Sequence, residues 1–128
     1  MTDKEIPFVT GPSEKMLNDR ELVMYREWRR TFIEWLLHEG KNPERMEGYA
    51  ESTVQKTAYR TAKLLRWIWE EEGGYTLGIT QEHADRFMKE LAYSDYSNVH
   101  KSNTQKAVKR LFSWLAHERN GEEWEPER

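Results

Sequence analysis

Lysine and arginine side chains without acidic neighbours are the groups in this sequence with the clearest chemistry. Two segments, 53–69 and 96–117, contain no Asp or Glu, although the whole chain has a net charge of −3. Cations concentrated on two clean faces of a mildly acidic protein can bind phosphates, which is the electrostatic pattern of a nucleic-acid binder. The basic residues of the two segments are Lys56, Arg60, Lys63 and Arg66, followed by Lys101, Lys106, Lys109 and Arg110.

Polar side chains beside these cations could contact bases or sugars. Asn103 has an amide that can pair with adenine in bidentate fashion, and Ser102 lies next to it. The alternative is ordinary: a basic helix face is usually solvated surface, Asn103 an exposed residue and Tyr59 a half-buried aromatic. The predicted DNA contacts are Thr53, Lys56, Tyr59, Arg60, Lys63, Lys101, Ser102, Asn103, Lys106, Lys109 and Arg110.

Two charge placements oppose the helix dipole, which favours acids at the N-terminal end of a helix and bases at its C-terminal end. The first basic segment is followed by three acids, Glu70–Glu72, and the second begins with Lys101 and no acid in its first turns. Locally unfavourable choices of this kind often mark a functional constraint. The missing acids also leave the N–H groups of the second helix open to a phosphate.

The histidines and carboxylates do not form a catalytic or metal-binding pattern. His83 and Arg86 spell H-x-x-R, but they fall in the first turn of a predicted helix, where polar residues usually act as cap and solvent face. No second His follows at helical spacing, and neither a glycine-rich phosphate loop nor a G-x-S-x-G motif is present. We therefore expect this chain to have no enzymatic activity of its own, no cofactor and no metal.

Four helices must position the basic residues, because apolar residues recur with helical spacing in four stretches and no stretch has a convincing strand pattern. The sequence therefore predicts an all-α fold, a compact bundle of four main helices. Capping preferences and glycines indicate where these helices begin and end. The predicted caps are Asn18 (with Glu21), Ser52 and Thr80, and the predicted stops are Gly40, Gly73-Gly74 and Asn120-Gly121.

A chain of 128 residues is long enough for one core. Residues 1–17 contain two prolines and no lasting period, so they are predicted to be a flexible N-terminal arm. Residues 18–120 would form the domain, and residues 121–128 an acidic tail or the start of a linker. No stretch is apolar enough for a membrane span and the N-terminus has no leader pattern, so we expect a cytoplasmic protein without a membrane partner.

Several short phrases follow one another in a recognisable order. Phe32-Ile33-Glu34-Trp35-Leu36 closes the first predicted helix, Leu64-Leu65-Arg66-Trp67-Ile68 the second and Leu111-Phe112-Ser113-Trp114-Leu115 the fourth, while Ile79-Thr80-Gln81-Glu82 introduces the third. From about Tyr25 to Pro126 the chain resembles the N-terminal core-binding (SAM-like) domain of tyrosine recombinases of the phage-integrase and Xer type.

That resemblance implies half of a C-shaped clamp around duplex DNA, with the second and fourth helices toward the DNA. The partners would be double-stranded DNA, the catalytic domain of the same recombinase and further copies of the protein on DNA. The catalytic residues of the family belong to a domain that would follow Pro126, so the resemblance implies none here. Two residues depart from the usual pattern, His100 at the start of the fourth helix and Thr57 in the second.

Two other functions fit the same sequence. A SAM-like bundle can be a protein-interaction module, with the Trp-rich first helix packed against a neighbouring subunit. A stand-alone regulator could instead occupy recombination sites without cutting DNA.

Overall fold

The computed structural model describes residues 6–119 and 123–126. Four long helices dominate these residues, and no strand occurs among them, so the prediction of an all-α bundle of four main helices is confirmed. The elements are α1 (Gly11–Glu14), α2 (Asp19–His38), the 3-10 helix η1 (Pro43–Arg45), α3 (Glu51–Glu72), α4 (Gln81–Ala92) and α5 (Asn98–Arg119).

Two of the predicted capping residues do start their helices. The side chain of Asn18 accepts a hydrogen bond from the backbone N–H of Glu21 at 2.8 Å, and the Glu21 carboxylate accepts one from the N–H of Asn18 at 3.0 Å. Thr80 caps α4 in the same reciprocal way, with Nδ1 of His83 accepting from its backbone N–H at 3.0 Å. These bonds satisfy N–H groups that the first turn of a helix leaves without partners.

The boundaries of α3 differ partly from the prediction. Ser52 is not its cap, because the helix already begins at Glu51 and is preceded by Ala50, which has no side chain that could accept a bond. The predicted end is confirmed: Gly73 follows the helix with a φ of 79°, a left-handed conformation that glycine adopts without strain. The predicted stop at Asn120-Gly121 lies outside the described residues.

The connection between α2 and α3 lies tightly against the end of α2. A Cβ atom on Gly48 would lie 1.7 Å from the carbonyl oxygen of Leu37, so no other residue fits there. The next residue, Tyr49, donates its backbone N–H to the carbonyl of Leu36 at 2.9 Å. This docking fixes where α3 starts relative to α2.

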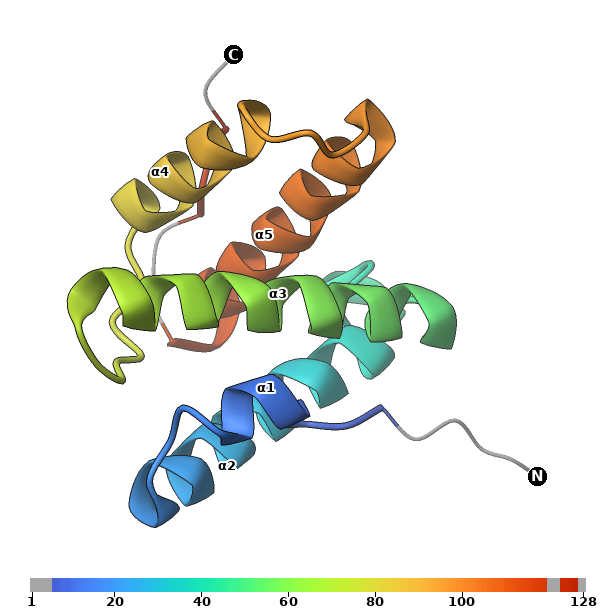
Figure 1. The fold of residues 1–128 in the computed structure, drawn as a ribbon. Helices are drawn as coiled ribbons and strands as arrows, with labels where there is room; N and C mark the ends of the chain where they lie inside the picture. Colours follow the sequence, from blue (N-terminus) through green and yellow to red (C-terminus); the bar gives the residue numbers. More distant parts are fainter. Residues whose placement is uncertain (1–5, 120–122, 127–128) are drawn as a thin grey trace.

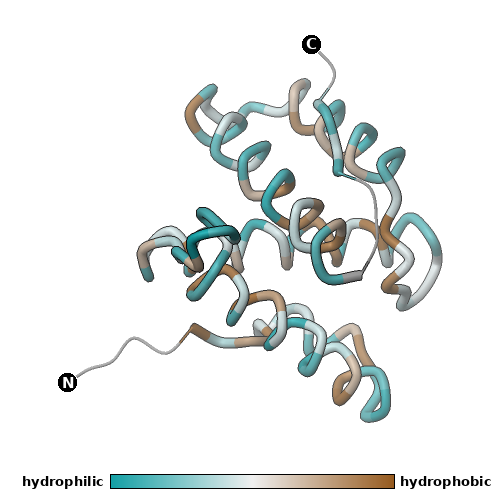
Figure 2. Tube along the Cα trace, turned by 180° about the vertical axis from the view of Figure 1, so that it is seen from behind, coloured by the Kyte–Doolittle hydropathy of each residue, from teal (hydrophilic) through white to brown (hydrophobic). Residues whose placement is uncertain are grey.

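Aromatic side chains fill the core between α2, α3 and α5. Trp114 is fully buried, with ring centroids 5.0 Å from Trp28 and 5.2 Å from Phe32. Tyr25 lies edge-on to Trp69 at 4.9 Å. Hydrophobic and hydrophilic segments alternate along the long helices in Figure 2, as expected for helices with one buried face.

Helix α3 is the central element, since it packs against α5, α2 and α4. Figure 1 shows α3 crossing α5, with α4 on one side of α3 and α1 and α2 on the other. The first turns of α3 and of α5 lie on the same side of this crossing. This arrangement brings the two predicted basic helices into direct contact.

Residues 6–17, expected to belong to a flexible arm, instead pack on α2 and α3. The fully buried guanidinium group of Arg29 holds them in place: it donates to the carbonyl of Phe8 at 3.2 Å. It also donates to the carbonyl of Ala58 at 2.6 Å and to Oγ1 of Thr61 at 2.8 Å. Burial lowers the pKa of Arg29, because removal from water disfavours the charged form.

A second arginine fixes the short helix α1. Nη1 of Arg66 in α3 donates to the hydroxyls of Thr10 at 3.1 Å and Ser13 at 3.0 Å. Ser13 is completely buried under this contact. The described part of the predicted arm is therefore tied to two helices by guanidinium groups.

The C-terminal residues that the structure describes also fold back onto the domain. Trp124 is only 2% exposed, and its indole N–H donates to Oδ1 of Asp85 in α4 at 2.8 Å. Its ring packs on Phe112 of α5, and the neighbouring Glu123 accepts a hydrogen bond from Ser113 at 3.1 Å. The part of the predicted tail that is described thus completes the core beside α4 and α5.

Candidate nucleic-acid interface

Helices α3 and α5 share a sequence pattern separated by fifty residues. Gln55-Lys56 is followed by Arg60, and Gln105-Lys106 is followed by Arg110. Burial repeats as well, because residues 52–60 and 102–110 show the same order of buried, half-buried and exposed positions. The similar closing phrases of the two helices were one signal of this relation. The shared Gln-Lys-x-x-x-Arg pattern is a second signal, visible when the two helices are aligned.

The pattern places the Lys and the Arg of each helix on one edge. Residues four apart in a helix lie on the same face, about 6 Å apart along the axis. The residue seven positions before the Arg, two turns earlier, lies on the same edge. Each helix thus has an edge of three residues, and we call the two together the paired basic edges: Thr53, Lys56 and Arg60 on α3, and Asn103, Lys106 and Arg110 on α5.

The arginines show that these edges turn toward each other. Nη1 of Arg110 reaches from α5 to α3, where it donates to Oγ1 of Thr57 at 3.0 Å, and the guanidinium lies 4.7 Å from the ring centre of Tyr49. Arg60 reaches in the opposite direction and lines a pocket with His100 of α5. The arginine of each edge therefore lies beside the first half of the other helix. Figure 1 shows the two helices crossing at an angle.

Four of the eight basic residues in the two predicted segments make no hydrogen bond or ion pair with any described residue. The ion pairs of the described residues lie within α2, between α3 and α4, and between neighbours near the end of α5. Acids from elsewhere in the described fold thus leave these cations unpaired. The four are Lys56, Arg60, Lys106 and Lys109, of which the lysines are exposed and Arg60 is half-buried.

Three of the predicted contact residues, Lys63, Lys101 and Arg110, instead bind within the protein. Lys63 donates to the phenol oxygen of Tyr96 at 3.0 Å and lies 4.8 Å from its ring centre. Lys101 donates to the carbonyl of Ala92 at 3.0 Å. With Arg66 engaged on α1 and Arg110 on α3, the fold uses half of the cations that the sequence presents as one group.

The polar candidates differ in exposure. Tyr59 is 49% exposed and Ser102 is exposed, whereas Thr53 and Asn103 are half-buried on the paired basic edges. None of the four hydrogen-bonds to another described residue through its side chain. Their polar groups form no hydrogen bond within the described fold, and their contact with DNA remains a prediction.

The acids at the end of α3 have a structural explanation. Glu71 pairs with Arg86, and Oε2 of Glu72 lies 2.9 Å from Nε2 of His83, both on α4. The positive charge of Arg86 and the hydrogen bond with His83 offset the unfavourable dipole. The functional interpretation of Glu71 and Glu72 is therefore unnecessary.

The same contacts account for the H-x-x-R sequence. His83 is buried, its Nδ1 accepts from the backbone of Thr80, and its Nε2 faces Glu72. Because Nδ1 accepts a hydrogen bond, the proton of the neutral ring is on Nε2 and is donated to Glu72. Arg86 stacks on Trp67 at 5.4 Å while it pairs with Glu71. Both side chains thus join α3 to α4.

No family model, no curated protein and no solved structure matches this chain. Among the described residues, no cluster of three or more His, Cys, Asp or Glu side chains could hold a metal ion. The described helices include none with the length and apolar character needed to cross a bilayer. The site therefore has to be interpreted from its own geometry.

Proposed function

We propose that this domain binds duplex DNA through the paired basic edges, as the DNA-gripping part of a site-specific recombinase of the tyrosine-recombinase type. The observation that carries the proposal is the repeated Lys-x-x-x-Arg edge on two helices that face each other, with Lys56 and Lys106 unpaired and exposed in the described fold. The order of the sequence phrases supports the recombinase class.

The spacing of the edges suits a phosphate backbone. A Lys and an Arg four residues apart span about 6 Å, close to two phosphate steps of one strand, which rise about 3.4 Å each along the axis. Two such edges at an angle offer contacts to the backbones on both sides of a groove. Phosphate contacts of this kind supply affinity and register, and Asn103 between them is suited to a base edge.

The proposal is tested by the salt dependence of binding to a fluorescent duplex, followed by anisotropy from about 50 to 200 mM salt. Lys106→Ala removes one phosphate contact, so the slope of log K against log salt should fall by about one unit, and affinity should drop alike for all duplexes. Lys89→Ala, an exposed lysine on α4, is the matched control and should leave the slope unchanged.

If Lys106→Ala and Lys89→Ala behave alike, the paired basic edges do not bind DNA. Failure of the unaltered protein to bind duplex DNA even at low salt would reject the proposal entirely.

A protein-interaction role is a second candidate, carried by a different surface from the one predicted. The tryptophans of α2 are not available, since Trp28 and Trp35 are 3% and 5% exposed. Val23 and Met24 at the start of α2 are instead 70% and 47% exposed. Sedimentation without DNA separates the candidates: self-association abolished by Val23→Ser would favour this role.

A further inference from the structure

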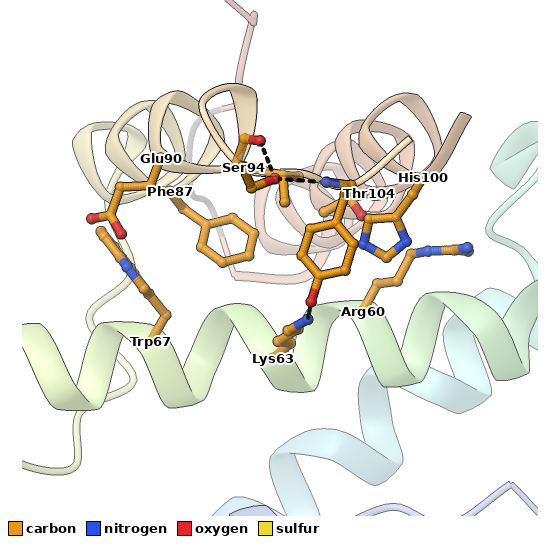
Figure 3. A pocket seen from close by; sticks show the side chains of 10 residues that line it. Arg60, Lys63, Trp67, Phe87, Glu90, Ser94, His100 and Thr104 are labelled. Atoms are coloured by element: carbon orange, nitrogen blue, oxygen red, sulfur yellow. Dashed lines mark hydrogen bonds between the residues drawn. The ribbon is translucent and has the colours of Figure 1, made fainter. Parts of the chain in front are cut away.

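A pocket of about 200 Å³ lies between α3, α4 and the first turns of α5. Its apolar wall consists of Trp67, Phe87 and Leu91, with the Trp67 and Phe87 rings in edge contact at 5.6 Å. Figure 3 shows these rings on one side of the space and His100 with Arg60 on the other. A volume of this size and an aromatic wall suit one small planar ring system.

Positive charge surrounds the mouth of the pocket. Arg60 and Lys63 line it from α3, against a single carboxylate, that of Glu90 on α4. Burial, followed by the charges of Arg60 and Lys63, lowers the pKa of His100. Lys63 likewise lowers the pKa of Tyr96, whose ring stacks on His100 at 4.3 Å. The local potential therefore favours an anion.

We propose that this pocket binds a small planar aromatic carboxylate. Its ring would lie against Trp67 and Phe87, and its carboxylate would face Lys63 and Arg60. Charge-assisted hydrogen bonds from Lys and Arg would provide the preference for the anion over a neutral ring. The site is defined by the pocket alone and does not depend on DNA binding.

The test uses calorimetric titration of the full chain, without DNA, with indole-3-carboxylate as the probe. Neutral indole and inorganic phosphate serve as separate arms. The proposal expects indole-3-carboxylate to bind, indole to bind at least about five-fold more weakly, and phosphate not to compete. The pKa of His100, followed by NMR, should rise on binding because the carboxylate offsets its cationic neighbours.

Variants identify the contacts. Lys63→Met should lower the affinity for indole-3-carboxylate by about five-fold and leave the affinity for indole unchanged. Lys109 is an unpaired lysine outside the pocket, so Lys109→Met should change neither affinity.

Three results would overturn the proposal. These are no binding of indole-3-carboxylate, equal binding of indole, and competition by phosphate, which would reduce the site to a general cationic patch. The titration contains no DNA, so these results do not bear on the proposed DNA binding. In the same way, a failure of the DNA-binding test would not affect the result of this titration.

Discussion

Arg29 and Arg66 differ from Lys56 and Lys106 in what the fold does with their charge. The arginines are turned inward: Arg29 donates to the carbonyl of Phe8 in the N-terminal segment and to that of Ala58 in α3. Arg66 donates to the hydroxyls of Thr10 and Ser13 in the N-terminal segment. The lysines lie exposed on the paired basic edges and have no partner among the described residues. All four cations belong to α2, α3 or α5, so the presence of a positive charge does not by itself identify a binding surface. What distinguishes the lysines is the lack of a competing partner.

Arg29→Ala should have the largest effect on stability. It removes a fully buried side chain and leaves the carbonyl of Phe8 without its donor, so the free energy of unfolding should fall by about 3 kcal/mol in urea denaturation. Arg29→Met retains much of the side-chain volume, so its free energy of unfolding should fall by less. If the free energy of unfolding of Arg29→Ala equals that of the unaltered protein, Arg29 does not stabilise the fold. The contrast between the inward arginines and the exposed lysines would then be lost.

Charge reversal on the paired basic edges should weaken DNA binding and leave the stability of the protein nearly unchanged. The double variant Lys56→Glu, Lys106→Glu should bind duplex DNA about 100-fold more weakly at low salt, because two attractive contacts become repulsive. Both positions are exposed, so urea denaturation should show little change in stability. Anisotropy and denaturation on the same samples compare the two effects. A large loss of stability with intact affinity would place these lysines with the structural arginines.

Asn103→Ala sharpens the comparison within one edge. If Asn103 contacts a base, affinity should fall by about 1–2 kcal/mol for the preferred duplex and little for others. Titrations against a set of duplexes that differ at single positions measure this. An equal loss on every duplex would make Asn103 a backbone contact like Lys106.

The smallest expected effect concerns Lys63, which is intermediate between the two groups. Its ammonium group lowers the pKa of Tyr96 below the ordinary value of 10.0, because the hydrogen bond that it donates, and then its positive charge, favour the phenolate. Lys63→Met should therefore raise the pKa of Tyr96, as measured by NMR titration of the ring. Lys109→Met is the control and should not move it. A pKa unaffected by Lys63→Met would show that the contact between Lys63 and Tyr96 does not persist in solution.

Much of the architecture follows from local sequence signals. The capping bonds of Asn18 and Thr80 and the stop at Gly73 involve residues at most four positions apart, and these predictions are confirmed. The prediction of Ser52 as a cap is wrong, because α3 begins directly after Ala50 and has no capping side chain. The unpaired cations of the candidate site are also visible as a charge pattern, since a segment without acids contains no local partner for them.

The amino-acid sequence by itself determined the four helices, their apolar faces and the segregation of basic residues, because these depend on neighbours within one or two turns. Only the tertiary structure decided which cations remain free, how the N-terminal segment docks and where Trp124 is buried. Those outcomes rest on contacts such as Arg29 with Phe8, 21 residues apart, and Trp124 with Asp85, 39 apart. Such pairs form only when packed helices bring distant segments together, and no local pattern encodes them.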